Sequence, residues 1–277
     1  MARQARSKSQ EPNPQLSEFA RDPGEGNMPW GVRAAKAMSS AQSNRWTYIA
    51  LLGGSDTLAF RLRTAQGHLR RDMFPSYWSE SILIQTQGPS LENARAIHVP
   101  LAQPEGPKFS TRDNGVVSRP LSDFDDAARF PNIALIALPI AQEQILQRVR
   151  DFCASRATLD TLEHVLRWLA YAWGVARTGN PLHENYGLPS ACMLETVCAA
   201  ASFDLTPGLE ARASCPEAIW SAAKHWYEYF AQAHGNMPQG RYWHPHMYPI
   251  TEAPSDENPP GVVEPPPATR KRNPRRA

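Results

Sequence analysis

The sequence lacks the short motifs that mark the common phosphate, zinc-protease and serine-hydrolase sites. It has no glycine-rich phosphate loop, because Gly53-Gly54-Ser55 lacks the spaced glycines and the lysine that cradle phosphates. HExxH and GxSxG sequences are also absent. His244 and His246 stand two residues apart, but a lone pair of this kind is more often part of a loop than of a metal site. The sequence therefore implies no cofactor and no metal.

The chain has few cysteines and a small net charge. The chain has 4 cysteines in 277 residues, and they form no CxxC pair and no zinc-like cluster with histidine. Reduced cysteines in a cytoplasmic protein are the simplest interpretation. The 29 basic and 27 acidic side chains leave a net charge of +2, which does not indicate a nucleic-acid-binding surface.

Long apolar runs are missing as well. The longest one, residues 133–140, is far too short to span a bilayer. The basic N-terminal start is not followed by the apolar region of a secretory signal. We therefore expect a soluble, cytoplasmic protein with no membrane span.

A globular body is nevertheless expected, because 42% of the residues are hydrophobic and eight are tryptophan. Residues 1–40 and 249–277 are rich in polar, charged and proline residues without periodicity, which predicts disordered tails around one domain at 41–248. The proline-rich C-terminal tail ends in a basic cluster. That cluster can make a weak contact with an acidic partner, or it can simply solubilise the chain.

Hydrophobic periodicity changes along this domain. Five strands are predicted: an apolar run at 44–52, an alternating segment at 76–86, and short segments between Gly, Pro and Asp clusters at 94–102, 114–120 and 132–140. One helix is expected between the first two strands, and a period of 3.6 then predicts helices near 145–153, 159–173, 189–203 and 214–230. Strands segregated from helices indicate an α+β fold, with a small, mostly antiparallel sheet packed against a helical C-terminal half.

Two local patterns within these helices lead to specific expectations. Leu162, Leu166, Leu169 and Trp173 recur at one-face spacing after Leu159, which predicts that they form the buried face of their helix. Ser214 and Glu217 have capping-box spacing, which predicts reciprocal hydrogen bonds at the start of the last helix.

The start of the helix at Pro189-Ser190 is the most site-like feature. A helix N-terminus gathers unpaired N–H groups and positive potential, which lower the pKa of a thiol and stabilise an oxyanion. Cys192 is expected on this first turn. The simpler alternatives are that Ser190 caps the helix and that Cys192 fills apolar space.

The order of these parts resembles the permuted papain-like hydrolases, which include NlpC-type and YiiX-like enzymes and the lecithin–retinol acyltransferases. The similar segments are 59–66, 75–83, 117–124, 129–135, 188–195 and 203–208. The resemblance implies a histidine on a strand that precedes the helix bearing the cysteine. Here the expected Ser-His pair reads Ser79-Glu80, and Ser190 rather than Cys192 is in register with Glu195.

Three functions follow from this resemblance and from the tail. The first is a papain-like domain that has lost its hydrolytic pair and binds a protein, peptide or small molecule in a vestigial cleft between Ser190 and Glu80. The second is a cysteine hydrolase or acyltransferase acting on an amide or thioester bond, with Cys192 as nucleophile and His98 as base. The third is an adaptor that uses the proline-rich basic tail.

Overall fold

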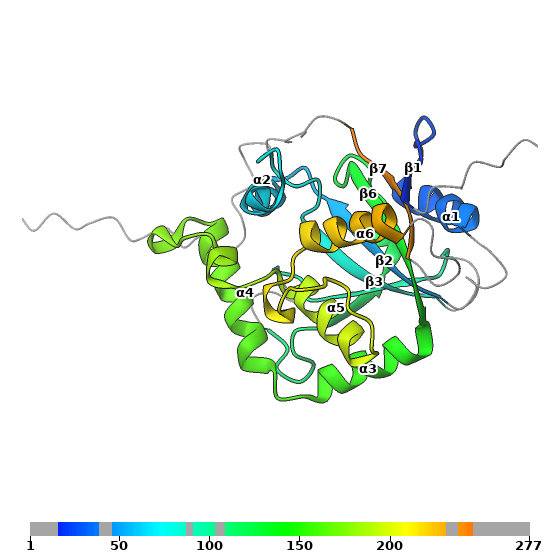
Figure 1. Ribbon diagram of the computed structural model, residues 1–277. Coiled ribbons are helices and arrows are strands. Elements are labelled where there is room, and N and C mark those ends of the chain that lie inside the picture. Colours follow the sequence, from blue (N-terminus) through cyan, green and yellow to red (C-terminus); the bar gives the residue numbers. More distant parts are fainter. Residues whose placement is uncertain (1–15, 39–45, 87–90, 103–108, 231–237, 246–277) are drawn as a thin grey trace, which may run out of the picture.

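A single mixed β-sheet forms the centre of the part of the chain that the computed structural model describes, which is residues 16–38, 46–86, 91–102, 109–230 and 238–245. Its seven strands are ordered β1-β7-β6-β2-β3-β4-β5 (Figure 1). All neighbouring strands pair antiparallel except β1 and β7, which pair parallel. The strands are β1 (Leu16–Glu18), β2 (Trp46–Gly53), β3 (Glu80–Gln85), β4 (Arg95–His98), β5 (Val117–Pro120), β6 (Asn132–Ala141) and β7 (Gln239–Trp243).

The helices confirm the predicted α+β class. Within the described residues they are α1 (Asn27–Met38), α2 (Thr57–Ala65), α3 (Gln142–Ala154), α4 (Thr158–Ala172), α5 (Pro189–Ala200) and α6 (Pro216–Phe230). Residues of α2 to α6 share one buried cluster with one face of the sheet, and α1 packs against the other face. No helix in the described ranges is both long and apolar enough to cross a bilayer.

Alternation along the strands separates these two clusters. In β2, Ile49 and Leu51 face the helices α2 to α6, whereas Ala50 and Leu52 face α1. The central strand β6 is buried on both faces, as its nearly continuous apolar sequence predicts. Both layers of the core therefore depend on the same few strands.

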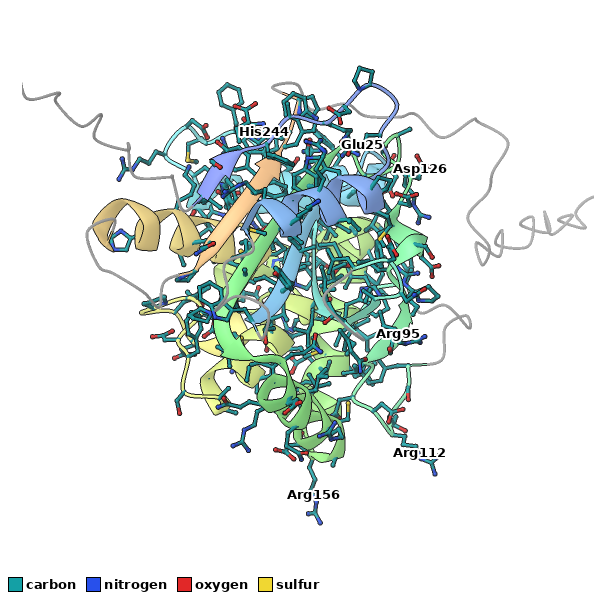
Figure 2. The ribbon with its side chains drawn as sticks, turned by 90° about the vertical axis from the view of Figure 1, so that its right-hand side faces the viewer. Glu25, Arg95, Arg112, Asp126, Arg156 and His244 are labelled. Carbon is teal, nitrogen blue, oxygen red and sulfur yellow. The ribbon has the colours of Figure 1, made fainter. Side chains whose placement is uncertain are left out.

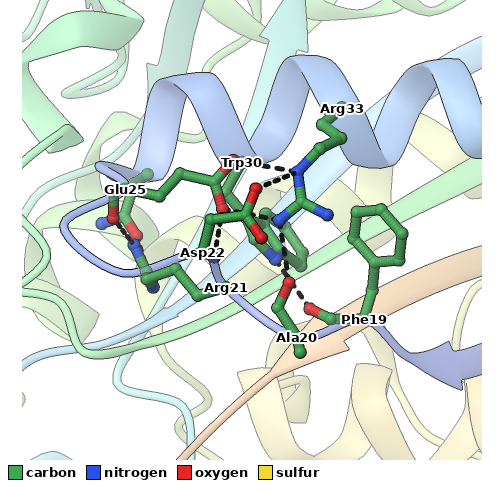
Figure 3. A network of polar contacts seen from close by, with 8 residues as sticks. Phe19, Ala20, Arg21, Asp22, Glu25, Trp30 and Arg33 are labelled. Atoms are coloured by element: carbon green, nitrogen blue, oxygen red, sulfur yellow. Dashed lines mark hydrogen bonds and ion pairs between the residues drawn. The ribbon is translucent and has the colours of Figure 1, made fainter.

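The segment at residues 16–38 is a correction to the predicted tail over residues 1–40. It contains β1 and α1, and α1 lies in front of the strands in Figure 2. Trp30 is fully buried, and its indole N–H donates to the carbonyl of Phe19 at 2.8 Å. An ion pair of 2.6 Å joins Arg33 to Glu25 beside it (Figure 3). Helix α1 is stabilised by packing its apolar residues on the sheet. The mostly polar sequence around these residues therefore gave no signal for a helix.

The N-terminus of α1 is held by a loop far along the chain. The Asp125 carboxylate accepts from the backbone N–H of Met28 at 2.6 Å, which satisfies one of the unpaired donors of the helix start. The remaining tail residues, 1–15, 39–40 and 249–277, lie outside the described residues, and so does the predicted basic cluster.

Helix α4 buries a different face from the one predicted. Its most buried residues are Thr161, His164, Val165, Trp168 and Ala172. Leu166 and Trp173 from the predicted inward stripe are instead 55% and 65% exposed. Apolar residues occupy both faces of this helix, so periodicity alone could not choose between them.

The predicted capping box at the start of α6 is wrong. The backbone N–H of Glu217 donates to Gln66 Oε1 at 2.8 Å, and its carboxylate accepts from the Ser76 hydroxyl at 2.6 Å. The Ser214 hydroxyl has no hydrogen-bond partner. Glu217 therefore joins α6 to α2 and to the segment before β3 instead of closing its own helix.

Candidate functional site

Glu80 and His98 are brought together on the α1 face of the sheet. His98 follows Ala96 by two positions on β4, and its ring packs edge-on against Phe124, with centroids 5.5 Å apart. Its Nδ1 lies 3.8 Å from the Glu80 carboxylate, and the histidine is 1% exposed. This contact belongs to the layer that α1 covers.

Ser190 lies on the opposite face of the sheet. Its hydroxyl donates to the carbonyl of Val99 and accepts from the N–H of the same residue, both at 3.0 Å. The residue at the cap position of α5 is Leu188, so Ser190 does not cap the helix as the simpler alternative held. Its hydroxyl instead fastens α5 to the chain that leaves β4.

The predicted cleft between α5 and β3 is almost filled. Glu80 and Ser190 both line the cavity there, but its volume is only about 10 Å³. That is room for about one water molecule. A ligand larger than water has no space between these residues.

A much larger groove lies on the other side of α5. It has a volume of about 520 Å³ and lies between α3, α4, α5 and residues 211–212. Its lining includes the apolar residues Phe152, Pro189, Met193 and Val197 and the polar residues Arg148, Asp151, Asp160, His164, Cys192 and Arg212. Arg156, in the loop between α3 and α4, points away from the body (Figure 2).

Cys192 lies two positions after Ser190 on α5, and residues two apart on a helix point to nearly opposite sides. Cys192 therefore faces this groove, whereas Ser190 faces the sheet. Its sulfur lies 3.7 Å from Nδ1 of His164, which is contributed by α4. The thiol donates to the carbonyl oxygens of Arg212 and Ser214, at 3.2 Å and 3.6 Å. Gly187 packs so closely here that an added Cβ would lie 2.7 Å from this sulfur and 2.1 Å from the Ser214 carbonyl. Only glycine leaves room for this arrangement.

The charge states of this pair oppose catalysis. Burial raises the pKa of the Cys192 thiol far above its ordinary value, with the neighbouring Cys215 as the next cause. Burial also lowers the pKa of His164, and the charge of Arg212 lowers it further, while the Gly187 carbonyl acts in the opposite direction. Both directions favour the neutral forms near pH 7, whereas a cysteine hydrolase needs the thiolate.

The backbone at Cys192 does not supply an oxyanion donor. Cys192 is the fourth residue of α5, and its N–H already donates to the Leu188 carbonyl at 2.9 Å. The unpaired N–H groups of a helix belong to residues before this point. Cys192 therefore lies on the first turn of α5, as predicted, but one position beyond the last unpaired N–H of the helix.

The structure does not bring Cys192 and His98 together. His98 packs in the α1 layer, whereas Cys192 lies beyond α5 on the other face of the sheet. The histidine that does reach the sulfur, His164, was not identified from the sequence. His164 lies four positions before Trp168 and next to Val165, so it shares their face of the helix. The sequence would have indicated this only if that face of α4, rather than the Leu166 face, had been taken as the buried one.

Metal ligands do not gather in the described ranges, where no group of three or more His, Cys, Asp or Glu side chains could hold an ion. His244 stacks on Tyr77, with ring centroids 3.8 Å apart, and His246 lies outside the described residues. All four cysteines are free of disulfides.

Comparison with protein-family models, with curated proteins and with solved structures gave no match. The candidate site therefore stands on its own geometry.

Proposed function

We propose that this chain is a permuted papain-like domain that has lost hydrolytic chemistry and acts by binding a small ligand in the groove between α3, α4 and α5. The helix and strand that the resemblance pairs, α5 and β3, are in contact. Ser190 also joins α5 to Val99, which directly follows β4. The proposed binding site, however, is the groove on the Cys192 side of α5 and not the small cavity between Ser190 and Glu80. The groove itself carries this proposal, because its volume of about 520 Å³ falls in the range of small-molecule sites.

The groove lining favours a ligand with an apolar body. Phe152, Met193 and Val197 offer apolar surface, and charged residues stand among them. This mixture of apolar walls with a few polar groups is typical of small-molecule sites, in which the polar groups orient the ligand.

Arg212 favours an anionic group on that ligand. Its guanidinium lies over the Tyr186 ring, 5.1 Å from the centroid, and no carboxylate pairs with it among the described residues. The other groove arginine, Arg148, already pairs with Asp151 at 3.1 Å. An incoming carboxylate or sulfonate would therefore meet Arg212 next to the neutral His164.

The test uses anilinonaphthalene sulfonate, whose apolar rings and single anionic group match these features. We expect saturable fluorescence with the wild-type chain. Ala200 is exposed and lines the groove, whereas its exposed neighbour Ala199 does not. Ala200→Trp should weaken probe binding by about tenfold or more, and the matched Ala199→Trp should not.

Arg212→Gln provides the second arm of this experiment. A charge-assisted contact contributes about 1.5–3 kcal/mol, so its loss should weaken probe binding roughly 10- to 100-fold. Circular dichroism confirms that each variant is folded. Non-saturable fluorescence, or equal binding by the Ala200→Trp and Ala199→Trp chains, would contradict the proposal.

A second candidate is cysteine chemistry, which the 3.7 Å contact between Cys192 and His164 favours. Iodoacetamide labelling of each cysteine, followed against pH by mass spectrometry, separates it from binding. With the raised thiol pKa, Cys192 should label more slowly at pH 7 than an unperturbed cysteine. Fast labelling of Cys192 below pH 7, lost on His164→Ala, would instead support a cysteine hydrolase or acyltransferase with His164 in the place assigned to His98.

A further inference from the structure

The groove between α3, α4 and α5 follows α5 along its whole length. Its lining residues on α5 recur at spacings of three and four, so they form one face of that helix: Pro189, Cys192, Met193, Thr196, Val197 and Ala200. About three helical turns separate Pro189 from Ala200, which makes the groove about 16 Å long. The three helices that enclose it lie together in the lower part of Figure 1. A ligand that fills this groove is therefore elongated.

The apolar part of the groove is narrow. Pro189, Met193 and Val197 are buried and form a single row along its floor. The lining on either side of this row is mostly polar or small, and Phe152 is the one large apolar side chain that α3 and α4 add to it. An amphipathic helix of a partner presents an apolar stripe at least about 100° wide, which would lie partly against these polar walls. An unbranched alkyl chain is narrow enough to follow one row of apolar residues.

An extended peptide would match the length of the groove but not its walls. The walls are mainly helical, and the backbone N–H and C=O groups of helices are paired within each helix. They offer no row of hydrogen-bond partners of the kind that a strand edge gives to a bound peptide. Peptide groups placed against Met193 and Val197 would lose their hydrogen bonds to water without replacement. An alkyl chain has no such groups to satisfy.

One end of the groove favours an anionic group. Arg212 lies at the N-terminal end of α5, where its carbonyl accepts from the Cys192 thiol at 3.2 Å. Apart from the ion pair within α3, the other charge in the described lining is Asp160. Arg212 changes the pKa of His164 more than Asp160 does, so Arg212 is the charge closer to this end. The opposite end, at Ala200, is exposed.

We propose that the groove binds an unbranched long-chain carboxylate, with its carboxylate on Arg212 and its alkyl chain extended along α5 towards Ala200. This inference rests on the proposed binding function and names the class of ligand. An extended chain advances about 1.2 Å per bond, as an extended polypeptide does over the three bonds of each residue. A groove about 16 Å long therefore holds a chain of roughly 13 carbons.

Displacement of anilinonaphthalene sulfonate by linear carboxylates, from hexanoate to hexadecanoate and below their micelle-forming concentrations, tests this ligand class. Affinity should rise about two- to fourfold per added carbon, because each methylene buries more apolar surface. The rise should stop at roughly 13 carbons, where the chain passes Ala200 and enters water. Cyclododecanecarboxylate, a compact acid with as many carbons as tridecanoate, should bind at least about tenfold more weakly than tridecanoate. Equal binding by these two acids would overturn the proposal.

Variants at the two ends of the groove test the orientation of the chain. Ala200→Trp should weaken dodecanoate binding by about tenfold or more but leave hexanoate unchanged, because the shorter chain ends well before this position. Arg212→Gln should weaken both by the same factor, and Asp160→Asn should strengthen both by up to about fivefold. Ala199→Trp, outside the groove, should change neither. Equal effects of Ala200→Trp on the two chain lengths would overturn the orientation.

The same titrations separate this inference from the binding function on which it rests. Saturable binding of anilinonaphthalene sulfonate without a gain in affinity along the carboxylate series would reject the long-chain ligand and leave the binding function standing. Absence of saturable binding of the fluorescent probe would reject the binding function, and the ligand class with it. Circular dichroism of each variant shows that a loss of binding is not a loss of folding.

Discussion

The two faces of the sheet are covered in different ways. One face is covered by α1 together with Phe124 and Phe130 from the segment between β5 and β6, and the cavity beneath it is only about 20 Å³. The other face carries α2 to α6, which pack against the strands but leave about 520 Å³ open between α3, α4 and α5. This open groove is separated from the sheet by α5. The side chains packed directly on either face of the sheet therefore stabilise the fold, whereas the side of α5 that faces away from the sheet is available for binding.

The largest expected effect concerns the closed face. Trp30→Ala removes a fully buried indole and its hydrogen bond to Phe19, which should lower the free energy of unfolding by about 3–5 kcal/mol. Denaturant titration measures this. Trp173→Ala, at an exposed position, should change it by less than about 0.5 kcal/mol. Similar losses in both variants would mean that α1 does not close the core.

A smaller loss of stability is expected on the helical face. Ser190→Ala leaves the buried N–H and carbonyl of Val99 without their partner, which should cost about 2–3 kcal/mol. Binding of the fluorescent probe should not change, because Ser190 points away from the groove. The exposed Ser122→Ala is the control. Weaker probe binding by folded Ser190→Ala chains would argue that the two sides of α5 are not independent.

The Glu217 carboxyl should produce a pH dependence of stability. Burial raises its pKa above the ordinary value of 4.5, so the folded chain keeps a proton that the unfolded chain has lost. Stability is therefore lost as the pH rises from about 4.5 towards the raised pKa, and Glu217→Gln should become relatively more stable over that window. Urea unfolding at several pH values measures the difference. The exposed Glu143→Gln should run parallel to wild type, and a parallel Glu217→Gln curve would contradict the prediction.

The smallest effect is expected at the Glu80–His98 contact. The Glu80 side chain is 24% exposed and 3.8 Å from the ring, so Glu80→Gln should change the free energy of unfolding by less than about 1 kcal/mol. It should leave probe binding unchanged. Thermal unfolding and the fluorescence titration check both points. A clear loss of probe binding would return the binding site to the cleft predicted beside β3.

Much of the fold could be predicted because its elements have strong periodicity. The nearly continuous apolar β6, the apolar and aromatic β2 and the alternating β3 were expected within a few residues of their observed bounds. The positions of α3, α5 and α6 were also expected, since each shows helical spacing after a turn signal. Helix α1 could not be predicted in this way, because its stability comes from a sheet formed much later in the chain.

The candidate site was harder to predict, because it depends on which face each residue occupies. A period of two shows that His98 and Val99 point in opposite directions, but only the assembled sheet shows that Val99 faces α5. On α4, apolar residues on both faces left it open which face is buried, so the face with Leu166 was chosen and His164 was not identified. Cys192 was identified because it sits near a helix start, and its neutral state arises from burial, which the local sequence does not encode.

The pairing of β1 with β7 has a consequence for how the chain is made. Leu16 lies beside Gly240, so the last strand of the sheet cannot be completed until almost the whole domain has left the ribosome. Residues of α1 are synthesised early, yet their partners on β6 and β7 emerge much later. Trp30 and Met38 therefore stay uncovered in the nascent chain throughout this delay. Refolding from denaturant removes the delay, because every strand is present from the start.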